Sequence, residues 1–125
     1  MVKILVAEDE RDIRELIAYT LMFAGYEVVQ ASNGADAVDL AVSARPDLIL
    51  MDVRMPRMTG YQACEALKQK PETQNTPVIF LSAKGQESEI QQGLGVGAVK
   101  YILKPFAPDE LTNQVQNVLK EINKA

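Results

Sequence analysis

The chain has 125 residues, a formal net charge of −4 and a pI near 4.8. That length builds one hydrophobic core and is too short for two, so we expect a single domain over residues 1–125. The acidic balance offers no basic patch to a phosphate backbone, which argues against direct nucleic-acid binding. No apolar run is long enough to cross a membrane and no signal peptide is visible, so we expect a cytoplasmic protein without membrane contact. The sequence has no histidine, which excludes histidine-based catalysis and histidine-ligated metals.

Short apolar segments alternate with amphipathic ones from one end of the chain to the other. Apolar residues at helical spacing predict helices, and short apolar runs bounded by turn residues predict strands. The run 48–51 is apolar at every position, which indicates a strand covered on both faces in the middle of a parallel sheet. The predicted elements are, in order, strand 3–7, helix 13–24, strand 27–31, helix 34–42, strand 48–52, helix 60–70, strand 78–81, helix 87–94, strand 99–103 and helix 108–122.

Local signals mark the beginnings of two helices and the surroundings of the single cysteine. Thr59 and Gln62 have the spacing of a capping box, and Pro108 suits the first position of the last helix. Cys64 cannot form an internal disulfide, and its helical spacing from Leu67 predicts a buried structural thiol.

Polar side chains follow four of the five predicted strands at the point where each strand ends. They are Glu8 and Asp9, Asp52, Ser82 and Lys104. Five strands that alternate with five helices predict a doubly wound α/β sheet with right-handed crossovers. The carboxyl ends of parallel strands open on one edge of such a sheet, and this edge is where open α/β sheets hold ligands.

Three carboxylates and one lysine at a single edge would attract a divalent cation. If the first strand lies beside the third, their ends are about 5 Å apart, and two negative charges at that separation repel by roughly 3 kcal/mol. One lysine leaves a net charge of −2. The candidate ligands are all oxygen, which favours Mg²⁺, with water and a backbone carbonyl such as that of Arg54 completing the site. In isolation, Glu8 and Asp9 could simply begin a helix and Asp52 could simply end a strand; their convergence favours a site.

On these residues the chain resembles the receiver domain of the two-component response regulators, with the single-domain chemotaxis regulator as the nearest familiar form. The resemblance covers essentially the whole length and implies a flavodoxin-like (βα)5 fold with strand order 2-1-3-4-5. The residues that carry it are the pair Glu8-Asp9, Asp52 with Met55-Pro56, Ser82-Ala83, Tyr101 and Lys104-Pro105.

The resemblance implies that Asp52 accepts a phosphoryl group from a phosphohistidine on a sensor histidine kinase or a histidine phosphotransfer protein. Lys104 and the Ser82 hydroxyl would hold the phosphoryl oxygens, and the Lys104–Pro105 bond would be cis. The implied ligands of a Mg²⁺ ion are Glu8, Asp9, Asp52 and the backbone carbonyl of Arg54.

The resemblance also implies a switch. Once Ser82 moves to the phosphoryl group, Tyr101 turns into the vacated space, and the face built from the last strand and the last two helices changes shape for an unidentified output protein. Without the resemblance, Tyr101 would be interpreted as an ordinary core aromatic residue with its hydroxyl at the surface. The protein would modify itself at Asp52 and release no product, so we do not expect an enzyme.

Several positions depart from the usual pattern of this family. Glu8 replaces the commoner aspartate, and this longer acid would bind metal through water. Ser82 replaces the commoner threonine. Arg54 and Lys84 occupy the two positions that flank the phosphoryl group and modulate its lifetime.

Residues 99–100 and Gln114 replace the charged residues through which many receivers with winged-helix output domains form dimers, so we expect a monomer. The chain could be a complete single-domain regulator or the receiver portion of a longer one.

Other classes of protein fit the sequence less well. Haloacid-dehalogenase-type enzymes need a second acid two residues after the nucleophile, and Arg54 stands there. A flavodoxin-like cofactor carrier needs a phosphate loop after the first strand, where Glu8 and Asp9 would repel phosphate. A scaffold that has lost its chemistry would not need both Asp52 and Lys104.

Overall fold

The computed structural model describes residues 1–83 and 87–122, with Glu87 described by its backbone alone. The elements within them have the predicted types and order. They are β1 (Lys3–Ala7), α1 (Arg11–Phe23), β2 (Glu27–Ala31), α2 (Gly34–Ala44), β3 (Leu48–Asp52), α3 (Gly60–Lys68), β4 (Val78–Ser82), α4 (Glu87–Gly95), β5 (Lys100–Leu103) and α5 (Pro108–Glu121). Among these described helices, none is both long enough and apolar enough to span a bilayer.

The five strands form one parallel sheet in the order β2-β1-β3-β4-β5, which confirms the predicted fold. The first strand lies beside the third, as the interpretation of the acidic cluster required. In the register of the sheet, Ala7 pairs with Met51 and Ser82 pairs with Leu103. The residues that follow these pairs therefore emerge at a common edge.

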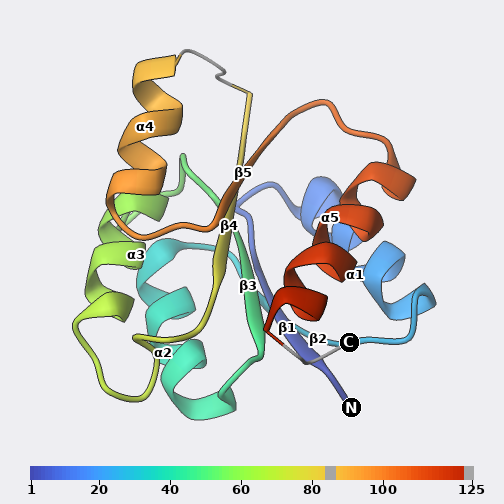
Figure 1. Ribbon diagram of the computed structural model, residues 1–125, viewed down its shortest axis with the longest axis horizontal. Coiled ribbons are helices and arrows are strands. Elements are labelled where there is room, and N and C mark those ends of the chain that lie inside the picture. The colour runs from blue at the N-terminus through green and yellow to red at the C-terminus, as the bar shows by residue number, and fades with distance from the viewer. Residues whose placement is uncertain (84–86, 123–125) are drawn as a thin grey trace.

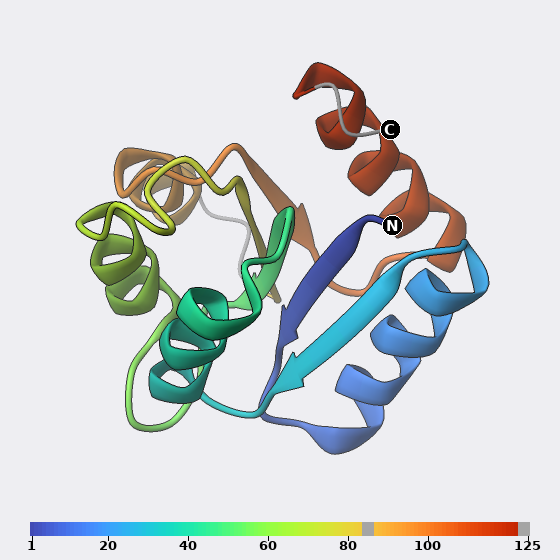
Figure 2. The same ribbon diagram turned by 90° about the horizontal axis from the view of Figure 1, so that it is seen from below.

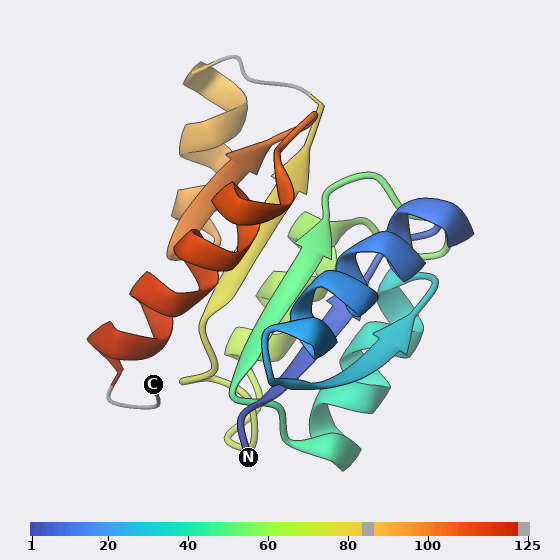
Figure 3. The same cartoon turned by 90° about the vertical axis from the view of Figure 1, so that its right-hand side faces the viewer.

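Helices cover both faces of the sheet. Figure 1 and Figure 2 show α1 and α5 on one face and α2, α3 and α4 on the other, and Figure 3 shows α1 and α5 lying across the first face. Side chains of β3 alternate between two cores because successive residues of a strand point to opposite faces. Leu48 and Leu50 join the core under α1 and α5, whereas Ile49 and Met51 join the core under the other three helices. The prediction of a central strand buried on both faces is confirmed.

The predicted local signals are present. Thr59 and Gln62 form the capping box at the beginning of α3, and Pro108 occupies the first turn of α5. The Cys64 thiol is buried and donates a hydrogen bond to the carbonyl of Val96 at 3.4 Å. Several boundaries differ from prediction by one or two residues. The helix α3, for example, ends at Lys68 rather than residue 70, because Pro71 disfavours helical geometry in the residue before it, and β5 begins at Lys100 rather than residue 99.

Candidate functional site

Strand ends from across the sheet bring an acidic cluster together. Glu8 and Asp9 follow β1, and Asp52 is the last residue of β3, the neighbouring strand. One carboxylate oxygen from each of the three residues lies within 4.8 Å of those of the other two. The predicted convergence of these three acids is therefore present.

The carboxylate of Glu8 is buried, and both of its oxygens accept hydrogen bonds. Its Oε1 accepts a hydrogen bond from the ammonium group of Lys104, and its Oε2 accepts one from the backbone N–H of Glu10 at 3.2 Å. The guanidinium group of Arg14 donates to the backbone carbonyl of Glu8 at 2.9 Å. A buried carboxylate needs such partners because burial without them costs several kcal/mol, on the order of the loss seen when one ion of a buried pair is removed.

Lys104 is the cation of the cluster. Its Nζ lies 3.4 Å from Oδ2 of Asp52 and also forms an ion pair with Oε1 of Glu8. Burial opposes the charge on the lysine, but the two neighbouring carboxylates outweigh that effect and raise the pKa of Lys104. The backbone N–H of Lys104 donates to the carbonyl of Ser82 at 2.8 Å, and the peptide bond between Lys104 and Pro105 is cis.

Asp9 stands at the exposed rim of the cluster. Desolvation, followed by the hydrogen bond and the negative charge of Glu8, raises the pKa of Asp9, and a backbone hydrogen bond and the charge of Lys104 only partly oppose this. Three carboxylates and one ammonium group leave the cluster with a net charge of −2.

A cavity of about 380 Å³ opens beside Asp52 and Lys104. Asp52 is 7% exposed and faces solvent through this cavity. The volume accommodates a phosphate-sized group together with a small hydrated ion. The cavity is lined by Asp9, Glu10, Ile13, Asp52, Arg54, Ser82, Ala83 and Lys104.

The structure gathers most of the predicted site residues around this cavity. Ser82 lies at the end of β4 and is 4% exposed, and Arg54 reaches the rim from the loop after β3. Lys84, the second predicted modulator of phosphoryl lifetime, lies outside the described residues.

Tyr101 belongs to a neighbouring aromatic cluster and does not line the cavity. Its ring packs edge-on against Phe80 at a centroid distance of 6.3 Å, and its hydroxyl lies 3.5 Å from that of Tyr61. Tyr61 was missed as a candidate functional residue. The available signal was a tyrosine on the inner face of an amphipathic helix, where its hydroxyl needs a partner.

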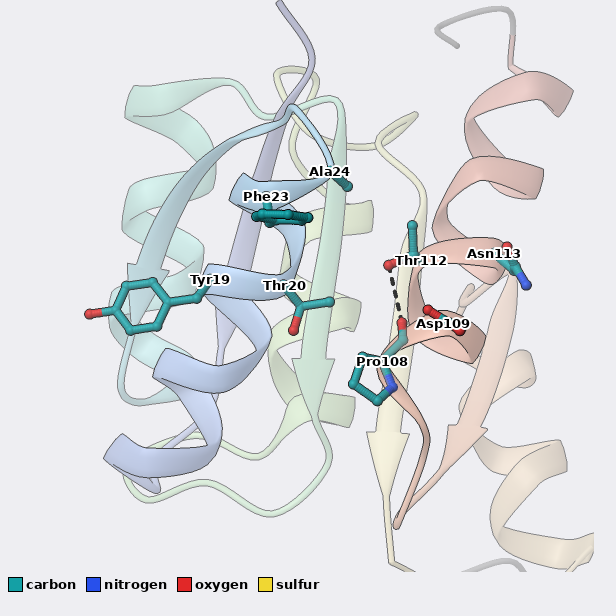
Figure 4. A pocket seen from close by; sticks show the side chains of 8 residues that line it. All are labelled: Tyr19, Thr20, Phe23, Ala24, Pro108, Asp109, Thr112 and Asn113. Atoms are coloured by element: carbon teal, nitrogen blue, oxygen red, sulfur yellow. Dashed lines mark hydrogen bonds between the residues drawn. The ribbon is translucent and has the colours of Figure 1, made fainter.

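A larger cavity, of about 620 Å³, lies between α1 and α5 and has a different character. Figure 4 shows Thr20 and Phe23 of α1 on one side, with Pro108 and Thr112 of α5 on the other. The Thr112 hydroxyl donates to the Pro108 carbonyl at 3.1 Å, as the dashed line marks. Asp109 is the one charged residue among those that line this cavity, so it lacks the clustered chemistry of the smaller one.

Comparisons with known proteins agree with this geometry. A family model described as the response regulator receiver domain matches residues 4–116. The chain is 44% identical over 117 residues to the phosphate regulon transcriptional regulatory protein PhoB of Pseudomonas aeruginosa, covering 94% of this chain and 51% of that protein. It is 38% identical over 122 residues to the probable transcriptional regulator ycf27 of Porphyra purpurea, covering 98% and 49%. The chain thus spans about half the length of the curated relatives it matches.

Solved structures give the same picture. Chemotaxis response regulator CheY4 of Vibrio cholerae superposes with a TM-score of 0.91 at 38% identity, covering 95% of this chain and 99% of that one. The receiver domain of sensor histidine kinase PA1611 from Pseudomonas aeruginosa superposes with a TM-score of 0.86 at 32% identity, covering 93% and 95%. That domain was determined with a magnesium ion coordinated in its active site cleft.

Proposed function

This chain belongs to the response regulator receiver domain family, and on that premise we propose that it is a phosphoacceptor switch. Asp52 takes a phosphoryl group from a phosphohistidine on a sensor histidine kinase or a histidine phosphotransfer protein. The observation that carries this proposal is the position of Asp52, which lines a cavity beside Lys104 and within 4.8 Å of two further carboxylates.

The transfer needs one bond to form and one to break. A carboxylate oxygen of Asp52 attacks phosphorus, the bond from phosphorus to the histidine nitrogen breaks, and the electron pair of that bond returns to the imidazole ring. Since β3 is buried along its whole length, the nucleophile is held by a rigid element, which favours a reactive geometry.

Lys104 supplies a positive charge, and Ser82 supplies a hydroxyl that can donate a hydrogen bond. The ammonium group of Lys104 is shared between Glu8 and Asp52 in this structure. It would form an ion pair with a phosphoryl oxygen once Asp52 is phosphorylated. The hydroxyl of Ser82 lines the same cavity and would donate to a second oxygen. Preorganised donors of this kind stabilise charge that develops during transfer.

The acidic cluster fits a Mg²⁺ ion. Its donors are carboxylate oxygens, which Mg²⁺ prefers, and its three carboxylates outnumber the one ammonium group of Lys104. The residues that would hold the ion are Glu8, Asp9, Asp52 and the backbone carbonyl of Arg54. When bound, Mg²⁺ would neutralise charge on the transferring group. Both carboxylate oxygens of Glu8 already have partners, which favours contact through water for this residue.

The output is binding to another protein, or to a further domain of the same protein. Phosphorylation would be read through Ser82 and Tyr101 at the face formed by α4, β5 and α5. Leu94 of α4 and Leu103 of β5 are exposed there and offer apolar contact area. Receiver portions joined to an output domain are the alternative arrangement, supported by relatives of about twice this length. Arg54 and Lys84 would set the lifetime of the phosphoryl group.

Intact mass after incubation with acetyl phosphate, with and without Mg²⁺, tests the proposal. The natural chain should gain one phosphoryl group only with Mg²⁺, and Asp52→Asn should gain none. Asp39→Asn is the matched control, since Asp39 is an exposed carboxylate on α2 outside the cavity. An adduct that persists in Asp52→Asn, or none in the natural chain, would reject the proposal.

A further inference from the structure

The hydroxyl of Tyr61 joins three elements of the fold. It donates a hydrogen bond to the backbone carbonyl of Glu89, in α4, at 3.1 Å, and lies 3.5 Å from the hydroxyl of Tyr101, in β5. A tyrosine hydroxyl has a single hydrogen, and Tyr61 gives it to Glu89, so Tyr101 must be the donor between the two hydroxyls. The result is a chain of hydrogen bonds that runs from β5 through α3 to α4.

Ring packing holds this chain in place. Tyr61 packs edge-on against Phe80 at 5.2 Å, with the ring planes 89° apart, and Phe80 packs edge-on against Tyr101. Edge-to-face pairs at these distances are favourable. Burial, with smaller contributions from the Tyr101 hydroxyl and the Glu89 charge, raises the pKa of Tyr61, so its hydroxyl stays a donor at neutral and moderately alkaline pH.

Few other contacts attach α4 to the rest of the domain. Among the described side chains of this helix, Ile90 and Glu89 are partly buried and the rest are exposed, so none of them is fully buried in the core. At its buried position Gly93, a Cβ atom would lie 2.9 Å from the Phe80 ring and 3.0 Å from the Tyr101 ring. The helix therefore rests directly on the rings that Tyr61 organises.

We propose that Tyr61 is a latch, a positioning residue whose hydroxyl holds α4 and Tyr101 together in the resting arrangement of the switch. This inference rests on the proposed function only for the release of the latch. If Tyr101 turns when Asp52 is phosphorylated, its hydroxyl leaves Tyr61 and the hydrogen-bond chain is broken. The Tyr61 hydroxyl then stabilises one of the two arrangements more than the other, which is the condition for coupling.

The consequence is that the Tyr61 hydroxyl helps to set the equilibrium between the two arrangements of the switch. Removing the hydroxyl should shift the balance away from the resting arrangement by about twofold to tenfold, the range that one net hydrogen bond gives. Because coupling is reciprocal, the same change should favour phosphorylation of Asp52.

Hydrogen exchange of backbone amides, measured by mass spectrometry on the full chain, tests the latch. In the unphosphorylated protein, Tyr61→Phe should speed exchange in α4 by about twofold to tenfold and leave α1 and α2 unchanged. Tyr19→Phe is the matched control, because Tyr19 is an exposed tyrosine of α1 on the opposite face of the sheet. Unchanged exchange in α4, or equal acceleration in all three helices, would overturn the latch, since the second result indicates a merely structural residue.

A second arm uses acetyl phosphate and Mg²⁺, with the adduct verified by intact mass in the same samples. The difference between Tyr61→Phe and the natural chain should shrink in the phosphorylated protein, because the latch is already open there. A difference of the same size in both states would show a static contact and overturn the release of the latch. Absence of any adduct in the natural chain would reject the proposed function instead, and the unphosphorylated comparison would still decide whether the latch exists.

Discussion

Lys104 and Glu8 are 96 residues apart in the chain, yet the lysine donates a hydrogen bond to the glutamate across the carboxyl edge of the sheet. Their strands, β5 and β1, are not neighbours, since β3 and β4 lie between them. The long lysine side chain spans this gap and reaches Asp52 on the way, at 3.4 Å. A single cation therefore balances two carboxylates, and any change at Asp52 alters the partner of Glu8.

Replacing this cation should destabilise the protein in a pH-dependent way. Lys104→Met leaves Glu8 buried without a counter-charge, so we expect a loss of about 3 kcal/mol in the free energy of unfolding near neutral pH. The contribution of Lys104 is fully present below the ordinary lysine pKa and is lost as the pH rises through the raised folded-state value, so the loss should shrink only in strong alkali. Urea unfolding near neutral pH, without divalent ions, measures it. Lys120→Met, at an exposed position of α5, is the control; equal losses in the two variants would contradict the assigned role of Lys104.

The raised pKa of Asp9 leads to a prediction about metal-free protein. The folded state holds the proton of Asp9 more tightly than the unfolded chain does, so this contribution to stability is present below the ordinary aspartate pKa and is lost as the pH rises through the raised value. Asp9→Asn should therefore raise the urea midpoint of metal-free protein at neutral pH, with the gain disappearing in acid. Stabilisation of the natural chain by added Mg²⁺ should be absent from this variant. A variant that Mg²⁺ stabilises as strongly as the natural chain would remove Asp9 from the metal site.

The hydroxyl of Ser82 should matter for the rate of phosphorylation. Ser82→Ala should slow adduct formation from acetyl phosphate by roughly tenfold to a hundredfold, since one hydrogen bond to a charged group contributes about 1.5–3 kcal/mol. Ser82→Thr restores a hydroxyl and should restore most of the rate. If both variants react alike, the hydroxyl has no part in the transfer.

Gly60 controls the backbone beneath Asp52. A Cβ atom at this position would lie 2.4 Å from the carbonyl oxygen of Asp52. Relieving this clash requires a shift of the backbone, which costs free energy. Gly60→Ala should therefore cost about 1–3 kcal/mol of stability and also slow phosphorylation, because the strand end must shift. Gly95→Ala is the control, since nothing lies within 4 Å of the added atom. Similar urea midpoints for the two variants would contradict this packing argument.

The sequence predicted the fold and most of the site because strand ends carry that information. Unbroken apolar runs locate the parallel strands, and the side chain after each run must emerge at the common edge, as Asp52 and Ser82 do. Which partners meet there depends on side-chain reach and on the spacing of distant strands. The pairing of Lys104 with Glu8 across two strands was therefore not predicted, and Glu8 was assigned to the metal alone.

The hydrogen bonds of Tyr61 were beyond prediction for a related reason. Helical spacing indicated only that the residue faces inward. Its partner in α4 is a backbone carbonyl, which every residue has, so no sequence pattern marks Glu89 as that partner. Contacts of this kind follow from the placement of whole helices.

The most direct test of the account is to locate the phosphoryl group chemically. Borohydride reduces an aspartyl phosphate to homoserine, so the protein is treated with acetyl phosphate and Mg²⁺, reduced, digested and mapped by mass spectrometry. Homoserine at position 52, and none in a sample that lacked Mg²⁺, is the predicted result. Homoserine at position 9, or no conversion of any aspartate, would contradict the assignment of Asp52 as the phosphoacceptor.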